Sequence, residues 1–102
     1  MARILLLHTT FPRKSDAIRT ARLLVKEKLS ACASVYPCES FFVWKGKLCQ
    51  EKEHALELKI VYGKYRKVER RIKELHPYSL PQIIAIEVKK GSREYLKWAM
   101  KG

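Results

Sequence analysis

Three histidines and three cysteines are the side chains of this sequence best suited to bind a metal ion or to react covalently. They are His8, His54, His76, Cys32, Cys38 and Cys49. The histidines lack the H-x-x-x-H spacing of a helical metal site, and the cysteines form no C-x-x-C pair. An odd number of irregularly spaced cysteines also gives no disulfide framework, so we expect reduced thiols. The sequence therefore predicts no local chelating motif.

His76 is the best single candidate for a functional residue, and it is the predicted metal contact. It lies between the end of a predicted helix and Pro77, on a turn rather than on a core face. Imidazole is a common metal ligand that titrates near neutral pH. The alternative is structural, with His76 capping the helix C-terminus or hydrogen-bonding a carbonyl there. Cys49 and His54 offer no second ligand pair, because five residues of regular strand place them on opposite faces.

Aromatic and charged side chains suggest a surface between subunits. Trp44, Tyr78 and Trp98 either line a pocket there or pack an interface. Trp44 lies at a hairpin tip, where a lone aromatic would be exposed in a monomer. Lys59 and Glu53 share one face of a strand but lie about 20 Å apart, so they cannot pair within one chain. Lys59 either meets a carboxylate of another chain or is solvated, as most such lysines are.

Motifs of hydrolytic enzymes are missing from the sequence. It contains no G-x-S-x-G, no H-E-x-x-H and no phosphate-binding P-loop, and it has four glycines. We therefore predict a protein that is not an enzyme and has no catalytic residues.

The hydrophobic periodicity predicts strands and helices in the order β-α-β-β-α-β, followed by a short helix. Expected strands span 3–10, 31–36, 41–44, 48–62 and 83–88, with Pro37 marking a bulge or an edge position and Lys45-Gly46-Lys47 a hairpin turn. Ser15 or Asp16 would cap the first helix, which ends near Ser30, and Pro77 would stop a second helix over 64–75. Ser92 would cap the last helix. Leu56, Leu58, Ile60 and Tyr62 would share one strand face.

This order is typical of one α+β domain over residues 1–102. We predict a ferredoxin-like βαββαβ sandwich with a four-stranded antiparallel sheet, an extended hairpin and a C-terminal helix. The hairpin over 31–62 is too long for so small a sheet, and its ends would leave unpaired edges. Pairing with neighbouring subunits would cover them, which favours a closed oligomer.

Four stretches of the sequence are distinctive when taken together. They are Thr9-Thr10-Phe11-Pro12, Leu29-Ser30-Ala31-Cys32, the hairpin segment 40–48 followed by Glu53 and Lys59, and residues 76–83 followed by Tyr95 and Trp98. In this order they resemble the CutA family of divalent-cation tolerance proteins. The resemblance implies a tight homotrimer similar to PII-type signalling proteins. It also implies a role in tolerance to divalent metal ions, copper in particular, through binding or signalling. The resemblance also implies clefts between subunits, near His76 as the metal contact. The residues that would line these clefts are Thr9, Trp44, Lys59, Tyr78 and Trp98.

The sequence departs from the family pattern where metal binding is concerned. Ser79 and Gln82 stand where relatives commonly carry acidic residues. Carboxylates supply charge and oxygen ligands, which serine and glutamine replace poorly. These two residues therefore count against the bound divalent metal ion, copper, that the resemblance implies.

The net charge of +12 leaves a second interpretation open. Lysine and arginine outnumber the acids by 22 to 10. This favours either a solvated basic surface or an anionic partner such as nucleic acid. A nucleic-acid-binding domain is the first alternative function, although the strand signature of RNA-recognition sheets is missing. A structural oligomer that binds another protein is the second. No apolar run is long enough for a membrane helix, and we expect a cytoplasmic protein.

Overall fold

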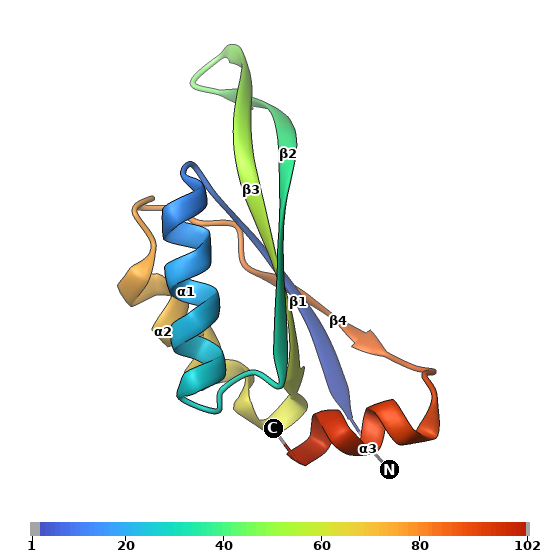
Figure 1. Ribbon diagram of the computed structural model, residues 1–102. Helices are drawn as coiled ribbons and strands as arrows, with labels where there is room; N and C mark the ends of the chain where they lie inside the picture. Colours follow the sequence, from blue (N-terminus) through green and yellow to red (C-terminus); the bar gives the residue numbers. More distant parts are fainter. Residues whose placement is uncertain (1–2, 102) are drawn as a thin grey trace.

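The computed structural model describes residues 3–101 of the chain. Its elements follow the predicted order (Figure 1): β1 (Ile4–Phe11), α1 (Lys14–Lys26), β2 (Cys32–Trp44), β3 (Lys47–Val61), a short 3₁₀ turn η1 (Tyr62–Lys64), α2 (Tyr65–Leu75), β4 (Ile84–Val88) and α3 (Arg93–Lys101). None of the helices within residues 3–101 is long and apolar enough to cross a membrane.

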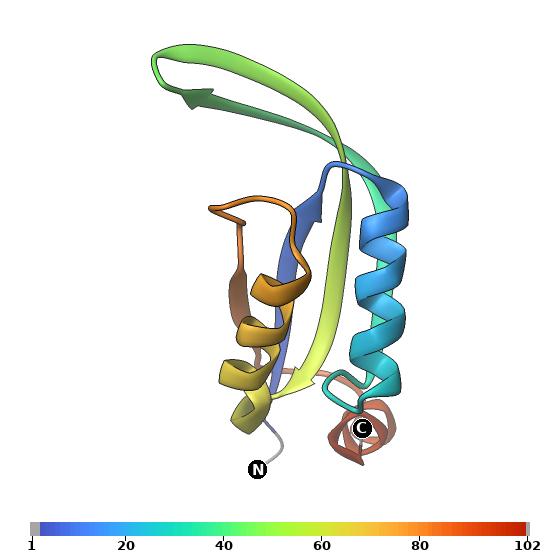
Figure 2. The same ribbon diagram turned by 90° about the vertical axis from the view of Figure 1, so that its left-hand side faces the viewer.

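The four strands form one antiparallel sheet in the order β2-β3-β1-β4. This is the predicted ferredoxin-like arrangement, so the fold prediction is confirmed. Helices α1 and α2 lie side by side over one face, and α3 lies at the end of the sheet where β1 begins (Figures 1 and 2). The sheet therefore has a helix-covered face and an open face.

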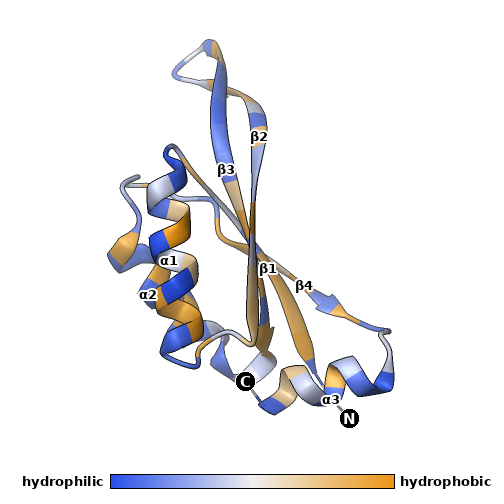
Figure 3. Ribbon diagram, viewed as in Figure 1, coloured by the Kyte–Doolittle hydropathy of each residue, from blue (hydrophilic) through white to orange (hydrophobic). Residues whose placement is uncertain are grey.

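The core fills the space between the sheet and the two helices. Alternate residues of β1 and β3 point into it, which is what the period of two predicts. Leu7, Leu58 and Ile60 are fully buried there, and Val68 and Ile72 of α2 pack against them. Figure 3 shows hydrophobic residues along β1, whereas hydrophobic and hydrophilic residues alternate along α1 and α2.

Tyr62 does not continue the buried row of β3, contrary to the prediction. The strand ends at Val61, and Tyr62 starts η1 and is exposed. Its ring instead lies under the Arg3 guanidinium, 3.8 Å from the ring centroid. Such a cation–π contact suits an exposed aromatic at a strand end.

The expected bulge at Pro37 is wrong, whereas the edge position is confirmed. β2 runs unbroken through Pro37, which pairs in register with His54. β2 is an edge strand, so one of its sides has no neighbouring strand. The backbone N–H that proline lacks is therefore not needed for a hydrogen bond on that side.

The first helix differs from its prediction at both ends. Arg13, rather than Ser15 or Asp16, is the N-cap residue. The helix stops at Lys26, four residues before Ser30, and Lys28 follows with a positive φ of 61°. A left-handed residue just past a helix is a common way to end it. Ser30 then donates its hydroxyl to the Lys59 carbonyl oxygen at 2.9 Å, which ties the turn to β3.

The hairpin of β2 and β3 projects well beyond the rest of the molecule (Figure 2). The principal extents are 45 × 25 × 22 Å. Lys45 and Gly46 form a two-residue turn with φ of 51° and 79°, the left-handed pair that a tight hairpin requires. Five large apolar side chains are exposed around this tip: Phe41, Phe42, Val43, Trp44 and Leu48.

Candidate functional site

Polar side chains from four segments meet at the base of the projecting hairpin. We call them the hairpin-base cluster: Thr10 at the end of β1, Ser40 on β2, Glu53 on β3, and His76 and Tyr78 in the turn after α2. The two-residue turn at 45–46 fixes the hairpin register, which pairs Cys38 with Glu53 and brings Ser40 diagonally next to Glu53. Pro77 stops α2, so the chain turns across the end of β1 there.

Glu53 is the centre of the cluster. Its side chain is buried, with the residue 5% exposed. Tyr78 donates its hydroxyl to one carboxylate oxygen at 2.6 Å, and Ser40 donates to the other at 2.7 Å. Burial alone raises the pKa of Glu53, but hydrogen bonds from Tyr78, Ser40 and Thr10 outweigh it and hold the pKa below its usual value. The carboxylate is therefore kept ionised.

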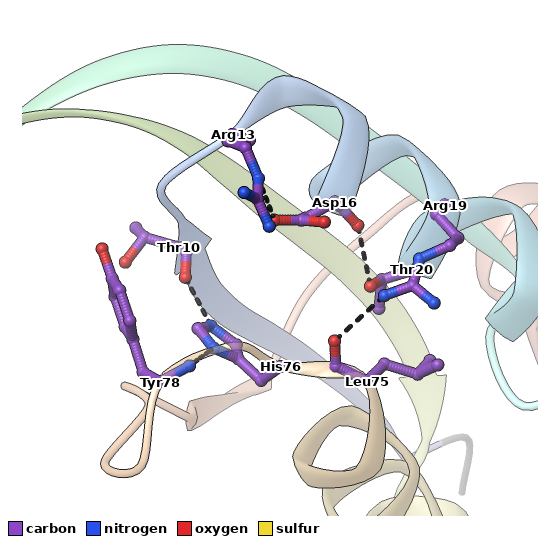
Figure 4. A network of polar contacts seen from close by, with 8 residues as sticks. All are labelled: Thr10, Arg13, Asp16, Arg19, Thr20, Leu75, His76 and Tyr78. Atoms are coloured by element: carbon purple, nitrogen blue, oxygen red, sulfur yellow. Dashed lines mark hydrogen bonds and ion pairs between the residues drawn. The ribbon is translucent and has the colours of Figure 1, made fainter.

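His76 is buried and held by both ring nitrogens (Figure 4). Its Nε2 lies 2.7 Å from the Thr10 carbonyl oxygen, and its Nδ1 lies 3.1 Å from the Tyr78 backbone nitrogen. A carbonyl only accepts and an amide N–H only donates, so Nε2 carries the proton and Nδ1 accepts. Burial lowers the pKa of His76, although the Thr10 carbonyl and the Glu53 charge oppose that shift. The ring is neutral and stacks on Phe11, with centroids 4.3 Å apart.

A second set of contacts fixes α1 beside the cluster (Figure 4). Arg13 pairs with Asp16 at 3.0 Å, and Thr20 donates to the Asp16 carbonyl oxygen at 2.9 Å. Arg19 donates to the Leu75 carbonyl oxygen at 3.3 Å, one residue before His76. The C-terminal end of α2 is thereby joined to both α1 and β1.

The predicted cleft residues do not come together within one subunit. Thr9 is fully buried on the helix-covered face, and its hydroxyl has no partner within residues 3–101. Trp44 is exposed at the hairpin tip, and Trp98 is exposed on α3, where it contacts the Tyr95 ring. Tyr78 alone of the five lies in the cluster.

Lys59 lies on the open face and pairs with a carboxylate of its own chain. Its Nζ is 3.3 Å from Glu57, two residues away on the same strand face. Glu53 instead bonds Ser40 and Tyr78, so the expectation that Lys59 and Glu53 do not pair within the chain holds.

The residues of one subunit do not form a ready metal site. Within residues 3–101, no three His, Cys, Asp or Glu side chains are grouped to hold an ion. His76 has no lone pair to offer, because Nε2 is protonated and Nδ1 accepts from Tyr78. His76 lies on the expected turn, but its side chain is buried rather than exposed away from the core. His76 is the C-cap residue of α2, as the structural alternative expects, but the carbonyl that its ring bonds is that of Thr10 at the end of β1 rather than one of the helix.

Sequence reasoning missed Glu53 as the organising residue, although a signal was present. Leu56, Leu58 and Ile60 define one face of β3, so Glu53 falls on the other. Counting back across the two-residue turn pairs Cys38 with Glu53 and leaves Ser40 one step away. The Tyr78 contact, 25 residues along the chain, has no such local signal.

Chemically, the cluster is a set of polar groups that satisfy one another. Three hydroxyls surround one carboxylate, and two backbone groups hold one imidazole. Such a network holds the hairpin base, the end of β1 and the turn at 76–78 in one arrangement. A shallow groove lined by residues of the two hairpin strands borders it, formed by Pro37, Cys38, Glu39, Lys52, Glu53 and His54.

Comparison with known proteins points to one family. The model of the family described as CutA1 divalent ion tolerance protein matches residues 5–102. The divalent-cation tolerance protein CutA of Pyrococcus horikoshii is 39% identical over 93% of each chain, and that of Thermus thermophilus is 37% identical over 87% of each. The solved structure of the Thermus thermophilus protein covers 96% of each chain, with 33% identity and a TM-score of 0.93. A structure described as the periplasmic divalent cation tolerance protein CutA from Archaeoglobus fulgidus covers 94% of each, with 34% identity and a TM-score of 0.91.

Proposed function

This chain belongs to the CutA1 divalent ion tolerance family, and we propose that it acts in divalent-cation tolerance as a homotrimer that binds and signals rather than catalyses. The observation that carries the proposal is the exposed apolar surface of the hairpin and the open sheet face. The family membership supplies the role, and the surface supplies the reason to assemble.

The hairpin tip exposes more apolar surface than is usual for a small protein that functions as a monomer. Val43 is 69% exposed and Leu48 is 77% exposed. The open sheet face adds Ile84 and Ile86, and β2 and β4 are free edge strands. Large exposed apolar patches mark interaction sites, and edge strands invite pairing. A closed ring of three copies would let each hairpin cover a neighbour.

We propose that copper binds between subunits. One described subunit does not group enough ligands, so the site would combine side chains of different copies. Thiols of Cys32, Cys38 and Cys49, which are free cysteines, suit soft copper ions. A metal contact through His76 requires Nδ1 to release the Tyr78 amide. Free thiols also suit the cytoplasmic location that we propose.

A binding role rather than catalysis is supported by the state of the polar groups. The Glu53 carboxylate is hydrogen-bonded to hydroxyls of the same chain, and the His76 imidazole is hydrogen-bonded to its backbone groups. Both groups are held in place by these hydrogen bonds, and of the two only Glu53 borders the shallow groove of the hairpin strands.

The test is the mass in solution, measured by light scattering before and after addition of Cu(II), with the bound metal quantified. We expect a mass near three subunits and copper bound in fixed ratio to protein. Leu48→Glu should shift the protein toward monomer, because it places a charge in the proposed interface. Ser15→Glu, at an exposed position of α1 away from the hairpin, adds the same charge; it is the matched control and should assemble normally.

The other outcomes are informative. A monomeric wild-type protein would contradict the trimer. A trimer without bound copper would keep the assembly, remove the metal and favour a structural oligomer that binds another partner.

A further inference from the structure

The two helices of the covered face present rows of basic residues that contain no acid. On α1 the row is Arg19, Arg22 and Lys26, and on α2 it is Arg66, Arg70 and Lys73. We call these rows the basic stripes. Each is spaced i, i+3, i+7 or i, i+4, i+7, which keeps its members on one side of a helix.

The stripes point away from the sheet. Ala17, Thr20 and Leu24 are the buried residues of α1, and Val68 and Ile72 are those of α2. At about 100° per residue, each stripe lies on the opposite side of its helix from the buried residues. All six stripe residues are exposed.

The stripes belong to one rigid surface because side-chain contacts join the two helices. Arg71 of α2 holds Glu27, just past the end of α1, with two hydrogen bonds of 3.0 and 2.8 Å. Arg19, near the middle of α1, donates to the Leu75 carbonyl oxygen at the C-terminal end of α2. Packed helices have axes about 8–10 Å apart, so the stripes run side by side at about that spacing. Figure 2 shows the two helices side by side in one layer.

Most acidic side chains near the stripes are paired with other basic residues. Asp16 bonds Arg13, and Glu27 and Glu74 both bond Arg71. Glu69 is the exception, since it pairs with the stripe residue Lys73 at 4.0 Å. Five of the stripe residues make no ion pair within residues 3–101: Arg19, Arg22, Lys26, Arg66 and Arg70. A solvated helix surface usually alternates charges, because like charges three or four residues apart repel. Residues 13–28 and 64–75 carry twelve of the 22 basic residues but four of the ten acidic ones.

We propose that this surface, the outer face of α1 and α2, binds the phosphate backbone of double-helical nucleic acid without reading its sequence. Rows of positive charge that match rows of phosphates gain affinity by releasing counterions. The walls of both DNA grooves, about 6 and 12 Å wide, are rows of phosphates. Charge complementarity to two such rows carries the choice of partner.

Other anionic partners fit this surface less well. Single strands are bound by stacking bases on aromatic side chains, and exposed aromatics such as Trp44 and Trp98 lie on the hairpin and α3 instead. Membrane surfaces are bound by helices with a free apolar face, but α2 buries Val68 and Ile72 in the core. The proposal goes beyond the tolerance role and does not depend on it, since the basic stripes face away from the open sheet face.

The test is binding of the full chain to a labelled DNA duplex of about 20 base pairs, measured by fluorescence anisotropy over a series of salt concentrations. The stripe variant is Arg22→Gln, Lys26→Gln, Arg66→Gln and Arg70→Gln combined. The control variant combines Lys89→Gln, Lys90→Gln, Lys97→Gln and Lys101→Gln, exposed positions outside the stripes, and loses the same charge. Circular dichroism confirms that both variants are folded.

We expect wild type to bind at low salt with a steep linear fall of log K against log salt. The stripe variant should bind at least about tenfold more weakly, and its salt slope should shrink by up to about 3–4, roughly 0.9 per lost phosphate contact. The control should retain wild-type slope and affinity within about twofold. Equal losses in both variants, no binding by wild type, or stronger binding to phosphatidylserine vesicles than to duplex would each overturn the proposal.

Discussion

The two faces of the sheet are formed by the same strands but differ in what covers them. On the helix-covered face, Leu56, Leu58 and Ile60 are fully buried beneath α1 and α2. On the open face, Ile84 and Ile86 are 53% and 62% exposed, and the hairpin beyond them is apolar at its tip. One face is therefore covered by its own chain, whereas the other is the surface that we propose further copies of the chain cover.

The hairpin-base cluster lies at the boundary between these regions. Its hydrogen bonds run from the projecting hairpin to the end of β1 and to the turn after α2. In the proposed assembly, Glu53 and Tyr78 would hold the base of the hairpin in the orientation that reaches a neighbour. Polar contacts would orient the hairpin there, and apolar contacts with a neighbour would supply most of the binding energy.

The largest expected effect comes from comparing one isoleucine on each face. Ile60→Ala should lower the free energy of unfolding by about 2–5 kcal/mol, because it opens a cavity among fully buried neighbours. The loss should be the same at every protein concentration. Urea unfolding followed by circular dichroism measures it.

Ile86→Ala is the matched variant on the open face. Its effect should grow with protein concentration, because the side chain is buried only on assembly. A concentration-independent loss at Ile86 as large as that at Ile60 would end the distinction between the faces.

A smaller effect is expected at the boundary itself. Tyr78→Phe removes the 2.6 Å hydrogen bond to the buried Glu53 carboxylate, and it should cost about 1.5–3 kcal/mol of unfolding free energy. Tyr36→Phe is the control, since that exposed tyrosine has no hydrogen-bond partner within residues 3–101. Equal unfolding free energies for the two variants would show that the cluster adds no stability.

The smallest effect concerns pH and the His76 ring. Its pKa is below the ordinary value of 6.5 in the folded chain, so the unfolded chain takes up a proton first as the pH falls. Stability should be full above about 6.5 and should decline as the pH drops from there toward the folded pKa. The same sign holds for Glu53, whose pKa lies below its ordinary value of 4.5.

Unfolding free energies measured at several pH values test this behaviour. The variant His76→Gln should lose the part of the slope just below the ordinary histidine pKa of 6.5. Were the variant to keep the wild-type slope there, the neutral buried imidazole would be refuted.

The elements of this fold were predictable because each carries its own periodic signal. The alternation in β3 marked its buried face, and Lys45-Gly46 marked the turn. Helix ends were less predictable, because Ser30 resembled a helix end while a left-handed Lys28 ended α1 earlier. The cluster was only partly predictable. Hairpin arithmetic places Ser40 beside Glu53, but the approach of Tyr78 depends on how the turn after α2 packs.

Amide hydrogen exchange of the hairpin tests most directly whether the open region is covered by other copies. In an isolated subunit, amides of residues 41–48 would exchange quickly, since two projecting strands protect each other poorly. We expect them to be protected nearly as well as those of β1, with protection lost in Leu48→Glu. Fast exchange of the hairpin in the wild-type protein, at concentrations where β1 stays protected, would contradict the idea that the hairpin and the open face are completed by neighbouring copies.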